Sequence, residues 1–162
     1  MKKIKEELNA FDVIGLCVQS NNKIEEDFEN SKIFPVVRRF VHDKIADQIP
    51  GRASTGVLYC GYTDYESDHE GEYTYFIGER VEQGTETPAG LMKITIPQQS
   101  YIKITSGPAP MPQVVKEPWQ KIWGMTARDL GGQRSFKTDF EIYDERAADH
   151  SAIVMDIFVG IE

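Results

Sequence analysis

The same succession of segment types occurs twice along this chain, and that repetition limits the folds that it can adopt. Runs rich in β-branched and aromatic residues predict strands, and apolar residues at helical spacing predict one long helix in each half. In the first half, the order is a strand at 11–18, a helix between 24 and 49, and strands at 56–63 and 72–81. In the second half, short strands at 91–96 and 101–105 precede a helix at 113–125 and strands at 135–144 and 153–161.

The closing strands of the two halves also resemble each other, since residues 73–78 read YTYFIG and residues 155–160 read MDIFVG. We therefore predict one α+β domain, residues 1–162, built from duplicated βαββ units at about 11–82 and 90–162. Such a domain has pseudo-twofold symmetry, antiparallel sheets and two main helices. The seam between the repeats is the expected place for a ligand cleft.

Proline and serine positions set the expected ends of the helices. Ser31 is a candidate N-cap of the first long helix, and Pro35 fits its first turn. The segment 106–112 contains three prolines and is predicted to be a loop. Pro118 lacks a backbone N–H, so the regular part of the second helix is expected to begin near it.

Charge and cysteine content narrow the classes of partner. Eighteen lysines and arginines against 26 acidic residues leave a net charge of −8, which repels phosphate backbones, so we do not expect a direct nucleic-acid partner. No apolar run reaches the length of a membrane span, and no signal peptide is visible, so a cytoplasmic protein without membrane contact is expected. Cys17 and Cys60 are expected to be buried free thiols.

The strand around residue 141 carries the candidate site. Alternation places Phe136, Thr138, Phe140 and Ile142 on one face, which we expect the helices to cover. Glu141 and Tyr143 then project to the opposite face, toward the seam between the repeats. A carboxylate surrounded by aromatic rings attracts cations, and burial without a partner should raise its pKa. The second helix adds Trp119 and Trp123 on one of its faces.

Several local patterns resemble the GyrI-like effector-binding domain, which forms the effector-binding half of many AraC-type and MerR-type regulators. The second half contributes Ile96-Pro97 followed by Tyr101, the run Trp119-Gln120-Lys121-Ile122-Trp123-Gly124, and Phe140-Glu141-Ile142-Tyr143. The first half contributes Gly15 and Pro35 with Arg39-Phe40. The chain is similar in the same way to integron-cassette drug-binding proteins. It has no helix-turn-helix segment, so we expect a stand-alone binder.

The resemblance implies a drug-binding pocket with a strand glutamate and surrounding tyrosines and tryptophans. Glu141 is then the carboxylate, and the candidate walls are Tyr143, Trp119, Tyr75, Tyr59 and Phe158. Trp123 is also a candidate ligand-binding residue, although its spacing favours packing in the core. The implied ligand is a small organic molecule, cationic or aromatic.

Other constellations do not predict a metal, a cofactor or a catalytic triad. The acidic residues between 64 and 72 alternate as in a calcium loop, but the glycine of the sharp turn is displaced to Gly71. The three histidines lack the spacing of zinc ligands. Asp149-His150-Ser151 is adjacent in sequence, which is the wrong arrangement for a nucleophilic triad.

Three functions therefore remain open at this stage. The first is a stand-alone module that binds a lipophilic cation or a drug-like aromatic molecule. The second is a small-molecule hydrolase in which Glu141 acts as general base on a water. The third is a protein-interaction role that resembles that of gyrase inhibitors, with the acidic surface docked on a basic protein partner. The sequence does not set the oligomeric state.

Overall fold

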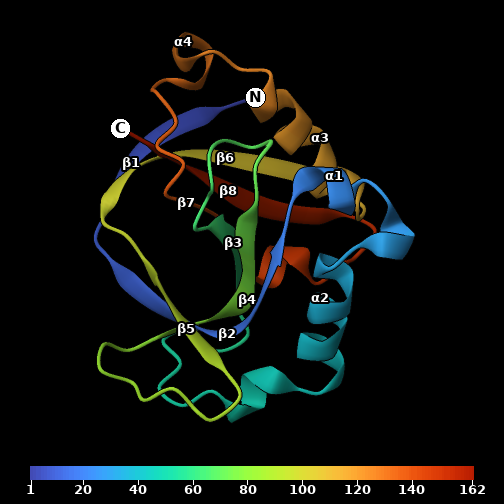
Figure 1. Cartoon of the computed structure of the whole chain (residues 1–162), viewed down its shortest axis with the longest axis vertical. Helices are drawn as coiled ribbons and strands as arrows, with labels where there is room; N and C mark the ends of the chain where they lie inside the picture. The colour runs from blue at the N-terminus through green and yellow to red at the C-terminus, as the bar shows by residue number, and fades with distance from the viewer.

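The computed structural model describes residues 1–162 and contains one eight-stranded sheet with its two long helices on the same side (Figure 1). The strands are β1 (Lys3–Leu8), β2 (Phe11–Ser20), β3 (Leu58–Thr63), β4 (Tyr73–Val81), β5 (Met92–Ile96), β6 (Gln99–Ala109), β7 (Thr138–Tyr143) and β8 (Ile153–Ile161). The helices are α1 (Asn22–Glu25), α2 (Ile33–His42), α3 (Gln113–Trp123) and α4 (Ala127–Leu130). Short 3-10 turns are η1 (Phe28–Asn30), η2 (Ile45–Gln48) and η3 (Glu145–Ala147). None of these helices combines the length and apolarity needed to cross a bilayer.

The strands follow the order β1-β6-β8-β7-β3-β4-β2-β5, and every neighbouring pair is antiparallel. The α+β class with an antiparallel sheet is therefore confirmed. This order is symmetric if each strand of the first half is matched with the strand four later, so that β1 corresponds to β5, β2 to β6, β3 to β7 and β4 to β8. In this pairing β1 adds to β6 and β5 adds to β2, so the first strand of each half extends the other half. The central pair, β3 and β7, joins the two halves.

The helix-covered face of the sheet contains two apolar clusters that meet at this central pair. One lies beneath α2 and includes Phe40 with Tyr75 and Ile77. The other lies beneath α3 and includes Trp119 with Met155. Tyr62 and Tyr143 pack against both clusters, because they project from β3 and β7 at the junction.

The opposite face of the sheet is closed by the sheet itself. Its cluster contains one buried residue from each strand between β2 and β8 and none from a helix: Val13, Tyr59, Phe76, Ile96, Tyr101, Phe140 and Phe158. Phe140 stacks on Phe158 with ring centroids 4.7 Å apart. The sheet curls toward β1 and β5 in Figure 1, and all seven residues of this cluster are buried.

This arrangement corrects the expected orientation of β7. The helices cover the face that carries Glu141 and Tyr143, while Phe140 points into the cluster that no helix covers. Taken alone, β7 presents a polar face at Asp139 and Glu141. Apolar residues of the neighbouring strands lie on the same face of the sheet, however, and supply the surface on which α2 and α3 pack. Phe136 lies before β7, in a left-handed backbone conformation (φ 52°), and not on the predicted strand.

Three other boundaries differ from those expected. The first long helix is divided into α1, η1, α2 and η2, with Pro35 in the first turn of α2 as predicted and the Ser31 hydroxyl accepting a hydrogen bond from Phe34 N (3.1 Å). The strand β1 was not predicted, because its charged, alternating residues belong to a solvent-facing sheet edge. Most of the predicted 106–112 loop extends β6 to Ala109, with a register shift after Ser106.

The helix α3 begins before Pro118 rather than at it. Pro118 cannot donate to the carbonyl of Val114, four residues earlier. The hydroxyl of Ser106 donates to that carbonyl instead, at 2.7 Å. The hydrogen bond from β6 therefore replaces the missing helical one and anchors α3 to the sheet.

We predict that Gly15→Ala strongly destabilises the protein. Gly15 faces Gly78 in the β2–β4 register, and a Cβ at residue 15 would lie 1.9 Å from the carbonyl oxygen of Ile77. Relief requires β2 and β4 to separate, at a cost of at least about 2 kcal/mol. Urea unfolding measures the change. Gly124→Ala is the control, because its Cβ would meet no atom closer than 3.6 Å and should change stability little.

Candidate functional site

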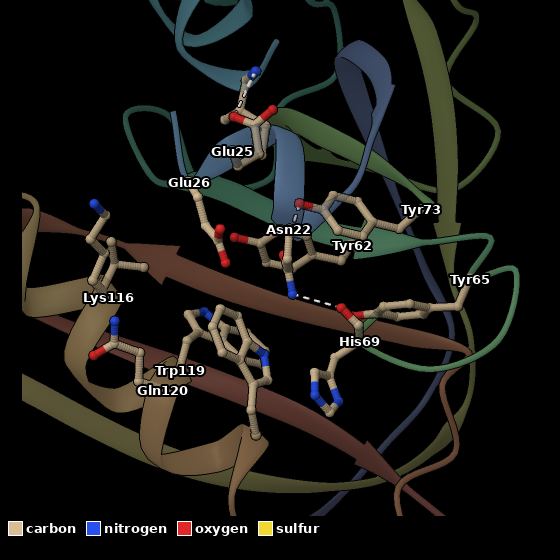
Figure 2. Close-up of a pocket in the computed structure, with 13 residues that line it drawn as sticks. Asn22, Glu25, Glu26, Tyr62, Tyr65, His69, Tyr73, Lys116, Trp119 and Gln120 are labelled. Carbon is tan, nitrogen blue, oxygen red and sulfur yellow. Dashed lines mark hydrogen bonds between the residues drawn. The ribbon is translucent and has the colours of Figure 1, made fainter. Parts of the chain in front are cut away.

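A pocket of about 250 Å³ opens between α1 and α3, above the junction of the two clusters (Figure 2). The first half of the chain contributes Asn22, Glu25, Glu26, Ile33, Tyr62, Tyr65, His69 and Tyr73. The second half contributes Val115, Lys116, Trp119, Gln120 and Trp123, all from α3. The pocket thus lies at the seam where the sequence predicted a cleft.

The floor of the pocket is aromatic and centred on Tyr62. Its ring packs edge-on against Tyr73 (5.1 Å between centroids), Tyr75 (5.6 Å) and Trp119 (5.4 Å). Antiparallel pairing of β3 and β4 sets Tyr62 opposite Tyr75, so the strand register brings these rings together. The surface of the floor therefore consists of ring faces and edges that pack against one another.

Glu141 lies directly behind this floor and is only 2% exposed. Its Oε2 accepts hydrogen bonds from Trp119 Nε1 at 2.7 Å and from the Tyr62 hydroxyl at 3.4 Å. Its Oε1 accepts one from the Tyr143 hydroxyl at 2.8 Å. Two of these donors, Trp119 and Tyr62, line the pocket, so they separate the carboxyl group from it.

Glu141 differs from every other buried acid of the chain in having no cationic partner. Four carboxyl groups are buried: Glu79, Asp139, Glu141 and Asp156. Three of them form ion pairs with arginine. Glu79 pairs with Arg52 at 3.4 Å, Asp139 with Arg134 at 2.6 Å, and Asp156 with Arg146 at 2.6 Å. Burying a charge without a counter-ion is costly, and at Glu141 only neutral ring donors offset that cost.

The pKa of Glu141 reflects this environment. Burial raises it from 4.5 to about 7, although the hydrogen bonds from Trp119, Tyr143 and Tyr62 act in the opposite direction. Burial, with a smaller contribution from Glu141, also raises the pKa of Tyr62 and of Tyr143 well above 10. Both hydroxyls therefore stay protonated and donate to the carboxyl group.

The other tyrosine hydroxyls of the pocket are also directed at polar groups of the protein. Tyr65 donates to the buried Asp139, which is held by Arg134. Tyr73 donates to the side-chain oxygen of Asn22, whose amide nitrogen in turn donates to the carbonyl of His69 (Figure 2). The rings consequently face the pocket while their donor hydrogens are used elsewhere.

The rim of the pocket contains two acids with different roles. Glu25 accepts hydrogen bonds from Ser20, Ser31 and the backbone at the start of α2, so its charge is occupied in holding that helix. Glu26 makes no ion pair, and its side chain reaches toward the space between α1 and α3 in Figure 2. Lys116 is on the opposite side of that space.

Most of the sequence-predicted site residues are near one another. Glu141, Tyr143 and Trp119 are hydrogen-bonded together, and Tyr75 contacts Tyr62 beneath the floor. Trp123 is not a core residue: it is 37% exposed and stacks on His69 at the rim, with centroids 5.9 Å apart.

Tyr59 and Phe158 do not reach this group. Both belong to the cluster on the opposite face of the sheet, with Phe140. They were selected as strand aromatics without knowledge of which face each strand presents.

The sequence did not point to Tyr62, Tyr65, Asn22 or His69 as site residues, and Tyr73 was noted as a strand aromatic but not chosen as a wall. Tyr62 could have been found by alternation once β3 was known to pair with β7, since that pairing sets Cys60 opposite Glu141 and puts Tyr62 on the same face. The pairing of β3 with β4 sets Tyr62 opposite Tyr75, so alternation along β4 then puts Tyr73 on this face as well. Tyr65 and His69 come from the acidic connection between β3 and β4. Nothing in its composition indicates that it folds over the pocket.

Metal and thiol chemistry have no further support here. No group of three or more histidine, cysteine, aspartate or glutamate side chains is placed to hold a metal ion. Cys60 is buried, and burial raises the pKa of its thiol, which makes it a poor nucleophile.

Known proteins share sequence and fold with this chain. The model of the Cass2 family, described as integron-associated effector binding protein, matches residues 4–161. YobU of Bacillus subtilis, which is named as a transcriptional regulator, is 34% identical over 101 residues, or 62% of this chain. The match spans 61% of the length of YobU.

Solved structures share the fold at lower identity. The integron cassette protein VCH_CASS2 of Vibrio cholerae superposes with a TM-score of 0.72 and 22% identity, covering 99% of this chain and 95% of its own. SAV2435, solved bound to tetraphenylphosphonium, gives a TM-score of 0.75 and 13% identity, covering 100% of this chain and 94% of its own. The predicted resemblance to effector-binding domains is therefore confirmed.

We predict that Glu141 makes folding stability fall with rising pH. Because its folded pKa lies above its unfolded pKa, the unfolded chain loses this proton first, and stability decreases between about pH 4.5 and 7. Between pH 5 and pH 8 this group should contribute a loss on the order of 2 kcal/mol. Urea unfolding of the wild type and Glu141→Gln at both pH values measures it. Equal pH dependence in the two proteins would contradict the assignment.

Proposed function

The chain belongs to the Cass2 family of integron-associated effector binding proteins, and we propose that its effector is a lipophilic organic cation bound between α1 and α3. The observation that carries this proposal is the unpaired buried acid: Glu141 alone among the four buried carboxyl groups lacks a cation. A ligand that brings a positive charge to the aromatic floor supplies that missing partner. A neutral ligand of the same shape does not.

The aromatic floor favours the same class of ligand. Tyr62, Tyr73 and Trp119 surround the space immediately above Glu141. Ring faces attract cations, and the attraction grows when the site is shielded from water. Since the hydroxyls of Tyr62 and Tyr73 already donate to acceptors of the protein, they offer the ligand oxygen lone pairs and ring surface. This floor lacks the strong donors that an anion requires, since Lys116 lies at the rim and not among the rings.

Entry of a bulky ligand requires a change at Tyr62. The pocket volume of about 250 Å³ is below the roughly 300–1,000 Å³ typical of sites for drug-sized ligands. The hydrogen bond from Tyr62 to Glu141, at 3.4 Å, is the longest and weakest of the three. Rotation of this ring both enlarges the pocket and exposes the carboxyl group, while Trp119 and Tyr143 keep it in position.

The geometry supports capture of a ligand better than hydrolysis. A general base needs an oxygen that faces a water or a substrate proton. In Glu141 both oxygens accept hydrogen bonds from aromatic side chains. A protein-interaction role has no comparable observation behind it, since the feature that distinguishes this site is internal.

We predict that tetraphenylphosphonium, the ligand named for SAV2435, quenches the fluorescence of this protein saturably. The chain contains only two tryptophans, and both Trp119 and Trp123 line the pocket, so intrinsic fluorescence reports directly on it. Triphenylphosphine oxide, which is aromatic and neutral, should bind at least about tenfold more weakly, or about 1.4 kcal/mol. Glu141→Gln should remove this preference.

Glu79→Gln is the matched control, because Glu79 is an equally buried acid on the same face but is paired with Arg52 outside the pocket. Its affinity for the cation should match that of the wild type. Near-ultraviolet circular dichroism checks that both variants fold. Equal preference for the cation in Glu141→Gln would contradict the proposal.

We also predict that cation affinity depends on pH. Below the pKa of Glu141, about 7, the ligand must displace a proton, so affinity should rise by up to about tenfold per pH unit and level off above pH 7. Isothermal titration calorimetry between pH 5 and 8.5 measures both the affinity and the proton release. A flat profile in the wild type would contradict a direct role of the carboxyl group.

A further inference from the structure

A second hollow lies on the opposite face of the sheet from the first pocket. Its volume is about 560 Å³, and it is lined at the ends of β2, β3 and β4 by Ala10, Phe11, Asp12, Ala53, Ser54, Tyr59, Arg80, Val81, Glu82, Gln83 and Thr95. Tyr59, which the sequence assigned to the first pocket, is therefore part of this hollow. No residue lines both pockets.

The wall of the hollow is an aromatic pair with an arginine above it. Phe11 and Tyr59 pack edge-on, with centroids 5.6 Å apart. The guanidinium carbon of Arg80 lies 4.3 Å from the centroid of Phe11. Stacking fixes the plane of the guanidinium group but leaves its in-plane N–H donors free. Arg80 takes part in none of the ion pairs of the chain.

One acid lies in the same hollow without a cationic partner. Glu82 is two residues beyond Arg80 in the chain and forms no ion pair with it. Asp12 also lines the hollow, but it alternates with Phe11 and Val13, so its side chain projects to the other face of the sheet, where it accepts a hydrogen bond from the Thr95 hydroxyl at 2.7 Å. Opposite charges that share a hollow without pairing leave both kinds of charge available to one ligand.

From this juxtaposition we infer that the hollow is a second binding site, for a small zwitterion that bears an aromatic ring, such as an aromatic α-amino acid. The ligand carboxylate pairs with Arg80, whose planar fork fits a carboxylate through two parallel hydrogen bonds. The ligand ammonium group lies toward Glu82. The ring packs on Phe11 and Tyr59, in the edge-on or offset geometry that aromatic groups prefer.

The alternative single-charge ligands fit less well. An organic anion gains Arg80 but meets Glu82 and the overall charge of −8. An organic cation gains Glu82 but leaves the stacked guanidinium facing its positive group. Only a ligand with both charges satisfies both side chains. This inference is independent of the effector proposed for the first pocket, because the two sites share neither residues nor face.

The test uses phenylalanine and two analogues that each lack one charge. The intact protein is titrated with phenylalanine, phenylalaninamide (no carboxylate) and N-acetylphenylalanine (no ammonium), and amide shifts are followed by ¹H–¹⁵N NMR. We expect phenylalanine to give saturable shifts at residues 10–12, 53–59 and 80–83, with each analogue at least about tenfold weaker. The indole N–H signals of Trp119 and Trp123 report separately on the first pocket and should not move with phenylalanine.

Variants then assign the charges to residues. Arg80→Gln should lower the affinity for phenylalanine to that of phenylalaninamide for the wild type, and Glu82→Gln should lower it to that of N-acetylphenylalanine. Arg38→Gln, which changes an exposed arginine on α2 away from the hollow, is the matched control and should have no effect. The inference is overturned if no saturable shifts occur, if either analogue binds as tightly as phenylalanine, or if Arg38→Gln and Arg80→Gln behave alike.

Discussion

The carboxyl group of Glu141 is buried, accepts hydrogen bonds from three aromatic side chains and has no cationic partner, and the account of the site depends on this arrangement. Its neighbours offset part of the cost of burial, and the remainder raises its pKa to about 7. A fully satisfied ion pair, like that of Asp139 with Arg134, stabilises a fold but has no use for a further charge. An acid that lacks only its cation is stabilised by any ligand that provides one. In the function that we propose, that difference separates the structural carboxylate of Asp139 from the binding carboxylate of Glu141.

The sheet makes such burial possible because both of its faces are closed. One face is covered by α2 and α3, and the other is enclosed as the sheet curls over the cluster around Phe140. The palindromic strand order puts β3 and β7 at the centre, where the two helix-covered clusters meet and where neither helix fills the space completely. The pocket occupies that gap, and its floor is made of the tyrosines that bridge the clusters.

Much of this could be predicted from the sequence, and the failures have identifiable causes. Every strand except β1, the presence of one long helix in each half, Glu141, Tyr143 and Trp119 follow from periodicity and local motifs. The face of β7 was assigned wrongly, because Asp139 and Glu141 look solvent-facing until the neighbouring strands are known. Strand pairing is non-local, so alternation alone could not tell that Tyr62 approaches Glu141 while Tyr59 and Phe158 turn away. The fold of the 64–72 connection over the pocket depends on tertiary contacts such as that between His69 and Trp123.

The charge state of Glu141 itself is the most direct test of this account. In protein labelled at the glutamate side-chain carboxyl carbon, the ¹³C signal that Glu141→Gln removes can be assigned to residue 141 and titrated with pH. The account predicts a midpoint near 7 in the free protein and a clearly lower one when the site is saturated with tetraphenylphosphonium. A midpoint near that of exposed glutamates, unchanged by the cation, would contradict it.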